Sequence, residues 1–202
     1  MVIYLIILLA ILTRFIPHMP NAAPVTALAI FAASYLPKKQ AIAIPLAVRF
    51  VSDIFLGFFS WPLMLAVYLS HLFGVVLGLW IRKSIKPVVI PSEAEESLSK
   101  GRQGISQLRL RFTRDDKITR WLKIGSSGFV AGTLFFLVTN FAFFYKEYAH
   151  NWAGIMLAYT NGLPFLRGTI IGDVGYTVAL FAAYELAKRF SQNFTRRKQE
   201  SF

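Results

Sequence analysis

The sequence predicts an all-α, polytopic membrane protein with a six-transmembrane-helix bundle, and three observations support this prediction. Hydrophobic residues make up 55% of the 202 positions, and the mean hydropathy is +0.52. Charged residues are only 16% of the chain, whereas a soluble domain contains about 25%. The charges are gathered in a few blocks, which leaves apolar runs of membrane-spanning length.

The six predicted spans cover residues 2–16, 24–36, 40–58, 63–81, 121–145 and 165–186, within a single membrane domain. The first ends where Arg14 and Pro17 interrupt the apolar run. The second begins at Pro24 and is short for a full span, so we expect it to be tilted or to lie behind other helices. The turn Gly57–Pro62 (GFFSWP) separates the third span from the fourth.

Three further segments complete the chain. Residues 83–120 are predicted to be a basic cytoplasmic linker, whose second half, 105–123, has the mixed apolar and basic composition of a helix on the membrane surface. Residues 152–164 are apolar but too short to cross a bilayer comfortably, so we expect an additional short interfacial or re-entrant segment before the last helix. Residues 187–202 are predicted to be a basic cytoplasmic tail.

The formal net charge is +12, and the basic residues are concentrated beside the ends of the predicted spans. In a soluble protein such a charge indicates nucleic-acid binding, but this placement is typical of the cytoplasmic ends of transmembrane helices. Six spans put both termini on the cytoplasmic side, whereas a seventh span over 152–164 would place the basic tail outside. We therefore predict a multi-pass protein of the cell (inner or plasma) membrane, with no nucleic-acid partner.

Polar residues of five segments fall in one layer near the outer face of this predicted bundle. An ionisable group inside a bilayer costs at least about 2.5 kcal/mol, so such groups face the bundle interior and usually mark a site. The candidate ligand-binding residues are Arg14, His18, Asn21, Asp53, Asn140, Arg167 and Asp173. Single members have structural explanations as well, since Arg49 and Asp53, four residues apart, can neutralise each other on one helix face. Taken together, the layer predicts a ligand cavity.

Two other features leave alternatives open. His71 lies near the middle of the fourth predicted span, where it can relay protons or donate one hydrogen bond to a neighbouring helix. Pairs of glycines with Gly-x-x-x-Gly spacing occur at Gly74/Gly78, Gly128/Gly132 and Gly168/Gly172. Such pairs let helices approach closely, either within the bundle or against a partner subunit.

The sequence shows no signature of catalysis. It has no HExxH, no GxSxG and no glycine-rich phosphate loop. Its three histidines lie on separate segments, and it has no cysteine. We therefore expect that the protein is not an enzyme and that it carries neither a cofactor nor a metal ion.

Four stretches resemble, in their order and spacing, an uncharacterised family of small bacterial membrane proteins. They are RFIPHMPNAAPVTALAIFAASYLP (14–37), VRFVSDIFLG (48–57), LFFLVTNFAFF (134–144) and NGLPFLRGTIIGDVGY (161–176). That family is similar to the substrate-capture (S) subunits of energy-coupling factor transporters. The resemblance implies a subunit that captures a vitamin-like small molecule from outside, with a transmembrane coupling subunit and cytoplasmic ATPases as partners.

The chain departs from S subunits in one respect. S subunits commonly dock the coupling subunit through an Ala-x-x-x-Ala pair on the first helix, and the first span here has no such pair. Ala29 and Ala33, or Ala23 and Ala27, have that spacing on the second segment. This departure bears on ATPase coupling more than on ligand capture.

The function expected from these observations is that of a substrate-binding integral membrane subunit of an uptake transporter. Its partners would be a small-molecule substrate and the lipid bilayer. Two alternatives remain. One is a proton-coupled secondary carrier that uses His71, Arg49 and Asp53, and the other is a non-transporting membrane scaffold.

Overall fold

The computed structural model describes residues 2–13, 15–17, 19, 21–85 and 102–200, with side-chain surroundings given outside 84–85, 102–116 and 192–200. Two predicted site residues, Arg14 and His18, lie outside the described residues, as does much of the predicted linker.

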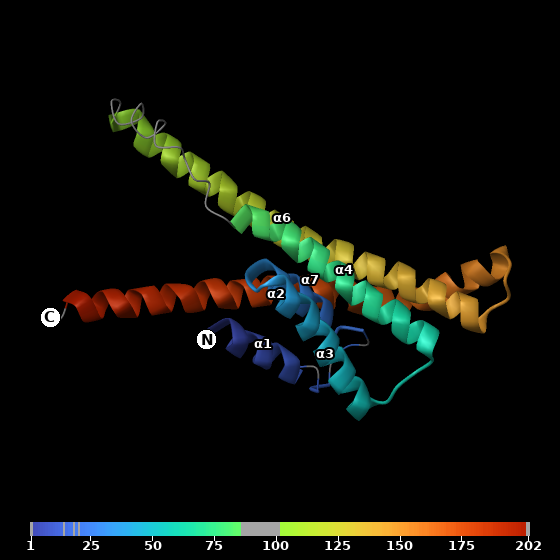
Figure 1. The fold of residues 1–202 in the computed structure, drawn as a ribbon. Helices are drawn as coiled ribbons and strands as arrows, with labels where there is room; N and C mark the ends of the chain where they lie inside the picture. The colour runs from blue at the N-terminus through green and yellow to red at the C-terminus, as the bar shows by residue number, and fades with distance from the viewer. Residues whose placement is uncertain (1, 14, 18, 20, 86–101, 201–202) are drawn as a thin grey trace.

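The described part of the chain is all-helical. Its helices are α1 (Val2–Thr13), α2 (Val25–Tyr35), α3 (Lys38–Leu56), α4 (Trp61–Ile85), α6 (Arg102–Glu147) and α7 (Trp152–Glu200). Figure 1 shows them as one elongated bundle in which α6 and α7 extend well beyond the others. Each helix overlaps one of the predicted spans, so the all-α prediction is confirmed.

Within the described residues, three helices are long and apolar enough to cross a membrane: Trp61–Lys83, Lys117–Glu147 and Trp152–Ser191. The shorter apolar helices α1 and α2 have 12 and 11 residues. At 1.5 Å per residue they reach only about 16–18 Å, against about 30 Å for the hydrocarbon core. The structure therefore supports an association with the membrane, and six complete spans remain a prediction.

Helix α2 is the centre of the bundle. Ten of its residues, from Val25 to Ser34, are buried, and it contacts each of the other described helices. Its position confirms that the short second segment lies behind other helices. Proline sets its two ends, because α2 begins directly after Pro24 and ends before Pro37, which starts α3.

Small residues bring α4 against α2. A Cβ atom on Gly78 would lie 2.2 Å from the carbonyl oxygen of Ile30 and 2.6 Å from the Cβ of Ala33, and one on Gly74 would lie 3.1 Å from the Cβ of Ala29. At Gly78 only glycine permits this approach, and at Gly74 a Cβ would make a tight contact. The Gly-x-x-x-Gly pair of α4 therefore packs inside the bundle, against the Ala-x-x-x-Ala pair of α2.

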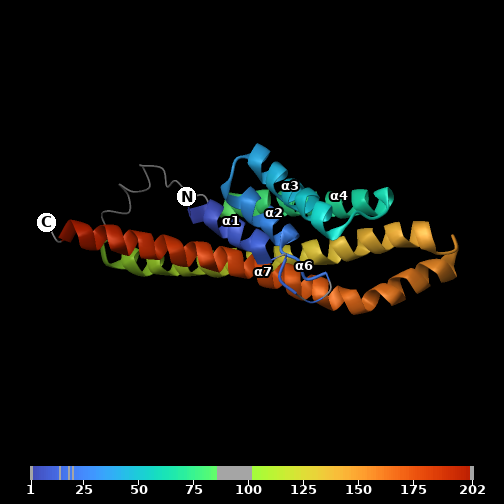
Figure 2. The same cartoon turned by 90° about the horizontal axis from the view of Figure 1, so that it is seen from below.

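Helices α6 and α7 form a hairpin and pack against each other (Figures 1 and 2), and their far ends diverge (Figure 1). Helix α7 is continuous over 49 residues with Pro164 inside it. The separate segment predicted over 152–164 is therefore wrong, since these residues form the first turns of α7. A proline removes one backbone hydrogen bond and bends a helix, but packing can keep the helix intact. Here Gly162 packs directly against Asn140 of α6. Residues 105–123, predicted as a helix on the membrane surface, are likewise part of the continuous helix α6.

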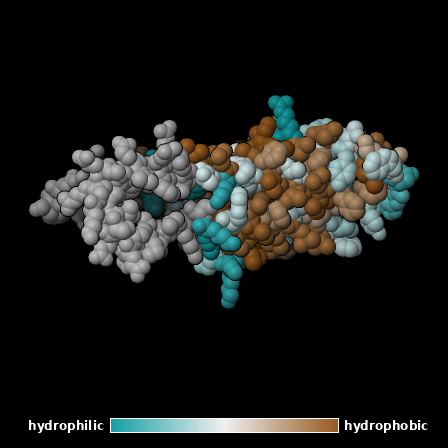
Figure 3. All heavy atoms as spheres, turned by 90° about the horizontal axis from the view of Figure 1, so that it is seen from above, coloured by the Kyte–Doolittle hydropathy of each residue, from teal (hydrophilic) through white to brown (hydrophobic). Residues whose placement is uncertain are grey.

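The surface of the bundle is strongly apolar over much of its length. Figure 3 shows a wide hydrophobic band with hydrophilic side chains toward both of its ends. Large exposed apolar side chains come from several helices, for example Leu8 on α1, Phe55 on α3 and Leu122 on α6. Such a band suits contact with lipid chains.

A small polar cavity as the candidate functional site

A cavity of about 210 Å³ lies among α2, α3, α4, α6 and α7, beside the loop that precedes α2. Its polar wall is formed by Asn21, Thr26, Arg49, His71, Thr169 and Asp173, and its apolar wall by Ala23, Leu56 and Phe135. The predicted convergence of polar groups from separate segments is therefore present. Lining a cavity does not by itself show binding, so the ligand-binding roles stay predictions.

The loop before α2 is held against α7. Asn21 has a positive φ of 61°, a conformation that asparagine tolerates better than most residues. The next residue, Ala22, is so close to α7 that a Cβ on Gly172 would lie 2.6 Å from its Cα. This contact fixes Asn21 at the cavity, near Asp173.

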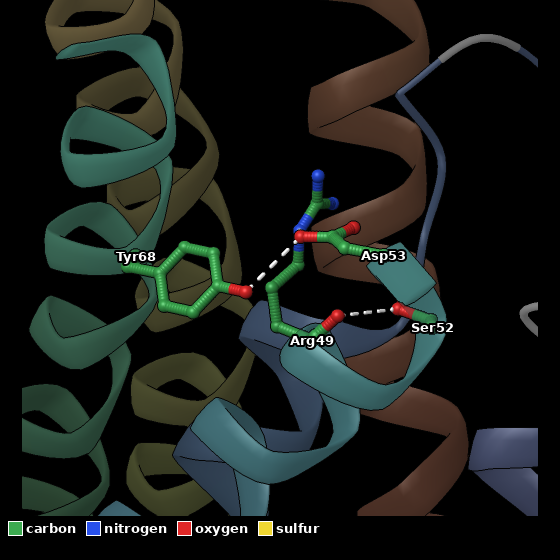
Figure 4. A network of polar contacts seen from close by, with 4 residues as sticks. All are labelled: Arg49, Ser52, Asp53 and Tyr68. Atoms are coloured by element: carbon green, nitrogen blue, oxygen red, sulfur yellow. Dashed lines mark hydrogen bonds and ion pairs between the residues drawn. The ribbon is translucent and has the colours of Figure 1, made fainter. Parts of the chain in front are cut away.

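Asp53 is buried and well partnered. Its Oδ2 accepts a hydrogen bond from Arg49 Nε at 2.9 Å and one from the Tyr68 hydroxyl at 3.1 Å. Figure 4 shows Arg49 and Asp53 of α3 beside Tyr68 of α4. The guanidinium group of Arg49 also lies 5.3 Å from the centre of the Phe59 ring. The neutralisation expected from the four-residue spacing is confirmed, and Asp53 holds Arg49 at the cavity without lining it.

A second group of hydrogen-bonded polar side chains is centred on Thr26. The Thr26 hydroxyl lies 3.0 Å from Nδ1 of His71, and its side chain also hydrogen-bonds Asp173. A hydroxyl has a single proton to donate, so if it donates to the carboxylate it accepts from the Nδ1–H of His71. His71 also stacks on Phe135, with ring centres 5.4 Å apart. These hydrogen bonds thus link α4, α2 and α7.

Asp173 has fewer partners among the described residues than Asp53, the other buried carboxyl group of this region. It is 3% exposed, and its Oδ2 accepts no hydrogen bond from any residue that the structure describes. A methyl group at Gly132 would lie 3.3 Å from that oxygen, so the carboxyl group is packed against α6. Within the described ranges Asp173 also forms no ion pair.

The structure brings together some of the predicted site residues and not others. Asn21 and Asp173 line the cavity, and Asp53 stands directly behind it. Asn140 does not reach the cavity, because its amide donates to the Phe136 carbonyl at 2.8 Å and its oxygen packs on α7. Arg167 is exposed and also lies outside the cavity wall.

Seven of the nine cavity residues were not among the candidate ligand-binding residues, namely Ala23, Thr26, Arg49, Leu56, His71, Phe135 and Thr169. Arg49 and His71 were assigned only to the alternative proton-coupled carrier. Thr169 had a usable signal, because it lies four residues before Asp173 and therefore on the same helix face. Thr26 and Phe135 had none, because threonine and phenylalanine are ordinary residues in apolar helices.

Comparison of the chain with known proteins supplies a family but no described activity. No curated protein matches the chain, and neither does any solved structure. Nothing in these comparisons connects the chain to the S subunits of energy-coupling factor transporters. The chain matches the family of unknown function DUF6580 over residues 1–194, nearly its whole length, and therefore belongs to that family.

Proposed function

We propose that the protein binds a small polar molecule in this cavity, as the substrate-binding membrane subunit of an uptake transporter. The observation that carries the proposal is the convergence of six polar side chains on one cavity, from the loop before α2, from α2, α3 and α4, and from α7, which supplies two of them. Polar and ionisable groups are costly in an apolar bundle and are typically retained where they serve a site. A scaffold has no use for such a cavity, so this alternative is less well supported.

The charge distribution favours access from the outer side. The cavity is lined by residues next to the 14–24 loop and the 57–60 loop, whereas Lys38, Lys39, Arg82 and Lys83 lie at the opposite ends of their helices. Basic residues flank the cytoplasmic ends of transmembrane helices. Under this orientation, the cavity opens away from the cytoplasm, as capture of an external substrate requires.

Coupling to an ATPase is the less supported half of the proposal. Ala29 and Ala33, the candidate docking pair, are fully buried and packed on α4. Ala27 is buried too. A coupling subunit would therefore dock on a different surface from the one that the resemblance to S subunits implies.

The test is mass spectrometry of small molecules that co-purify with the protein from its native membrane in nanodiscs. We expect a bound molecule in stoichiometric amount, and we expect it to be lost from Ala23→Phe, whose ring would fill the cavity. Leu163→Phe is the matched control, because Leu163 is exposed on α7 and away from the cavity wall. Equal retention by both variants, or no bound molecule in the wild type, would contradict binding in this cavity.

The second candidate function is a proton-coupled carrier, which the chain from His71 through Thr26 to Asp173 favours. Histidine and carboxylate chains inside membranes serve as proton relays. The carrier would not use Asp53, which Arg49 and Tyr68 already hold. In vesicles without any ATPase, the carrier predicts proton influx when the co-purified molecule is added, and a substrate-binding subunit predicts none.

A further inference from the structure

We infer that the molecule held in this cavity is a small organic monocation, whose protonated amine lies against Asp173. The inference rests on the proposed function, because it requires that the cavity binds a small molecule at all. It concerns the charge of that molecule and the residue that recognises it.

The first step is the charge balance of the cavity. The positive charge of Arg49 is matched by Asp53, with 2.9 Å between Nε and Oδ2. Asp173 has no such partner among the described lysines, arginines and histidines. If Asp173 ionises, no ion pair among the described residues compensates its negative charge. A ligand with a single positive charge balances it, whereas a neutral or anionic ligand does not.

The second step is the hydrogen bonding of Asp173. A carboxylate has two oxygens and can accept several hydrogen bonds. Within the described part of the chain, Thr26 donates to this carboxyl group, and Oδ2 has no donor. A buried charge is costly unless it is both paired and hydrogen-bonded. An ammonium group, with a positive charge and up to three N–H donors, supplies both.

The third step concerns the kind of cation. The described residues contain no group of three or more histidine, aspartate or glutamate side chains that could hold a metal ion. The cavity has instead a mixed wall in which Phe135 and Leu56 face the same space as Asp173. An aromatic ring face attracts cations, and apolar walls suit the carbon frame of an organic ligand. The volume of about 210 Å³ restricts the ligand to a small molecule.

The experiment compares probes that share a carbon frame and differ in charge. Benzylamine, benzyl alcohol and benzoate are titrated into the protein in nanodiscs by calorimetry at pH 7, with propylamine as a smaller amine. We expect an amine to bind at least about tenfold more tightly than benzyl alcohol, because a charge-assisted hydrogen bond forms, and we expect benzoate not to bind.

Two variants tie this preference to Asp173. Asp173→Asn keeps the shape and removes the charge, so the preference for the amine should disappear. Thr177→Val is the matched control, because Thr177 is buried one turn further along α7 and does not line the cavity. It should keep the preference. Equal binding of amine and alcohol by the wild type, or an unchanged preference in Asp173→Asn, would overturn the inference.

If none of the probes binds, the identity of the co-purified molecule tests the inference instead. If that molecule carries a protonated amine and is lost from Asp173→Asn but not from Thr177→Val, the inference stands. If it is neutral or anionic and is lost from Ala23→Phe, the proposed function survives and the inference fails. If no probe binds and no molecule co-purifies, both fail.

Discussion

Two buried aspartates of this bundle, Asp53 on α3 and Asp173 on α7, belong to the same polar layer but differ in their partners. They are 1% and 3% exposed. Asp53 accepts hydrogen bonds from Arg49 and Tyr68 and forms an ion pair with Arg49. Asp173 is hydrogen-bonded by Thr26, and its Oδ2 has no donor among the described residues.

The difference separates a structural carboxylate from a candidate functional one. Removing the partner of a buried ion pair is strongly destabilising, because a charge is left without compensation. Removing a charge that has no partner has no such cost. Loss of the cation beside Asp53 should therefore destabilise the protein, whereas loss of the Asp173 charge should not, and four variants test this contrast.

The largest effect is expected for Arg49→Met, which keeps an apolar stem but removes the positive charge. It leaves Asp53 buried without its cation and should lower the free energy of unfolding by about 3 kcal/mol. The measurement is thermal unfolding in nanodiscs. In the double variant Arg49→Met/Asp53→Asn much of the loss should be recovered, because the lone charge is gone. A double variant as unstable as Arg49→Met would show that the pair is not the cause.

The next largest effect is expected for Thr26→Val. The substitution preserves the shape of a side chain that is 2% exposed, but it removes the hydroxyl shared by His71 and Asp173. Because two buried groups lose a partner, we expect a loss of about 2 kcal/mol. Thr177→Val is the control on α7, since the Thr177 hydroxyl has no hydrogen-bond partner in the described part of the chain. Similar losses in both variants would show that the bridge contributes nothing.

A smaller effect is expected for Tyr68→Phe. It removes one donor to Asp53 but leaves the ion pair with Arg49, so the unfolding free energy should fall by about 1 kcal/mol. Tyr159→Phe removes an exposed hydrogen bond, 2.9 Å long, to the Leu137 carbonyl and should cost less. If Tyr68→Phe were as damaging as Arg49→Met, Asp53 would depend on the tyrosine more than on the arginine.

The smallest effect on stability is expected for Asp173→Asn. The amide removes a buried charge that has no ion-pair partner in the described residues, so the unfolding midpoint should stay unchanged or rise. A fall comparable to that of Arg49→Met would show that a cation of the protein already compensates Asp173. The contrast between the two aspartates would then be lost, and so would the case for a cationic ligand.

The helices of this bundle were largely predictable, because apolar runs, prolines and charged blocks are local features of the chain. The pairing of Arg49 with Asp53 was predictable for the same reason, since four residues on one helix place two side chains on one face. The convergence of Asn21 and Asp173 followed once the order of the spans was assumed. That prediction assumed that successive spans cross the membrane in alternating directions.

The continuity of α7 and the membership of the cavity were not predictable from local features. Whether Pro164 ends a helix or only bends it depends on what packs beside it, here Gly162 against Asn140 of α6. The bridge from His71 through Thr26 to Asp173 joins three helices that are distant in sequence. The failure of Asn140 and Arg167 to reach the cavity likewise depends on helix rotation, which composition does not determine.

By itself the sequence determined an apolar, all-helical chain with a few polar groups too costly to leave in lipid, because hydropathy and proline act locally. The tertiary structure decided which of these polar groups contact one another and which faces of small residues are buried between helices of the bundle. The physical reason is that the contacts depend on how closely the helices approach one another. The glycines of α4 let α2 pack at the centre of the bundle. There Thr26 bridges Asp173 and His71, which are far apart in the sequence.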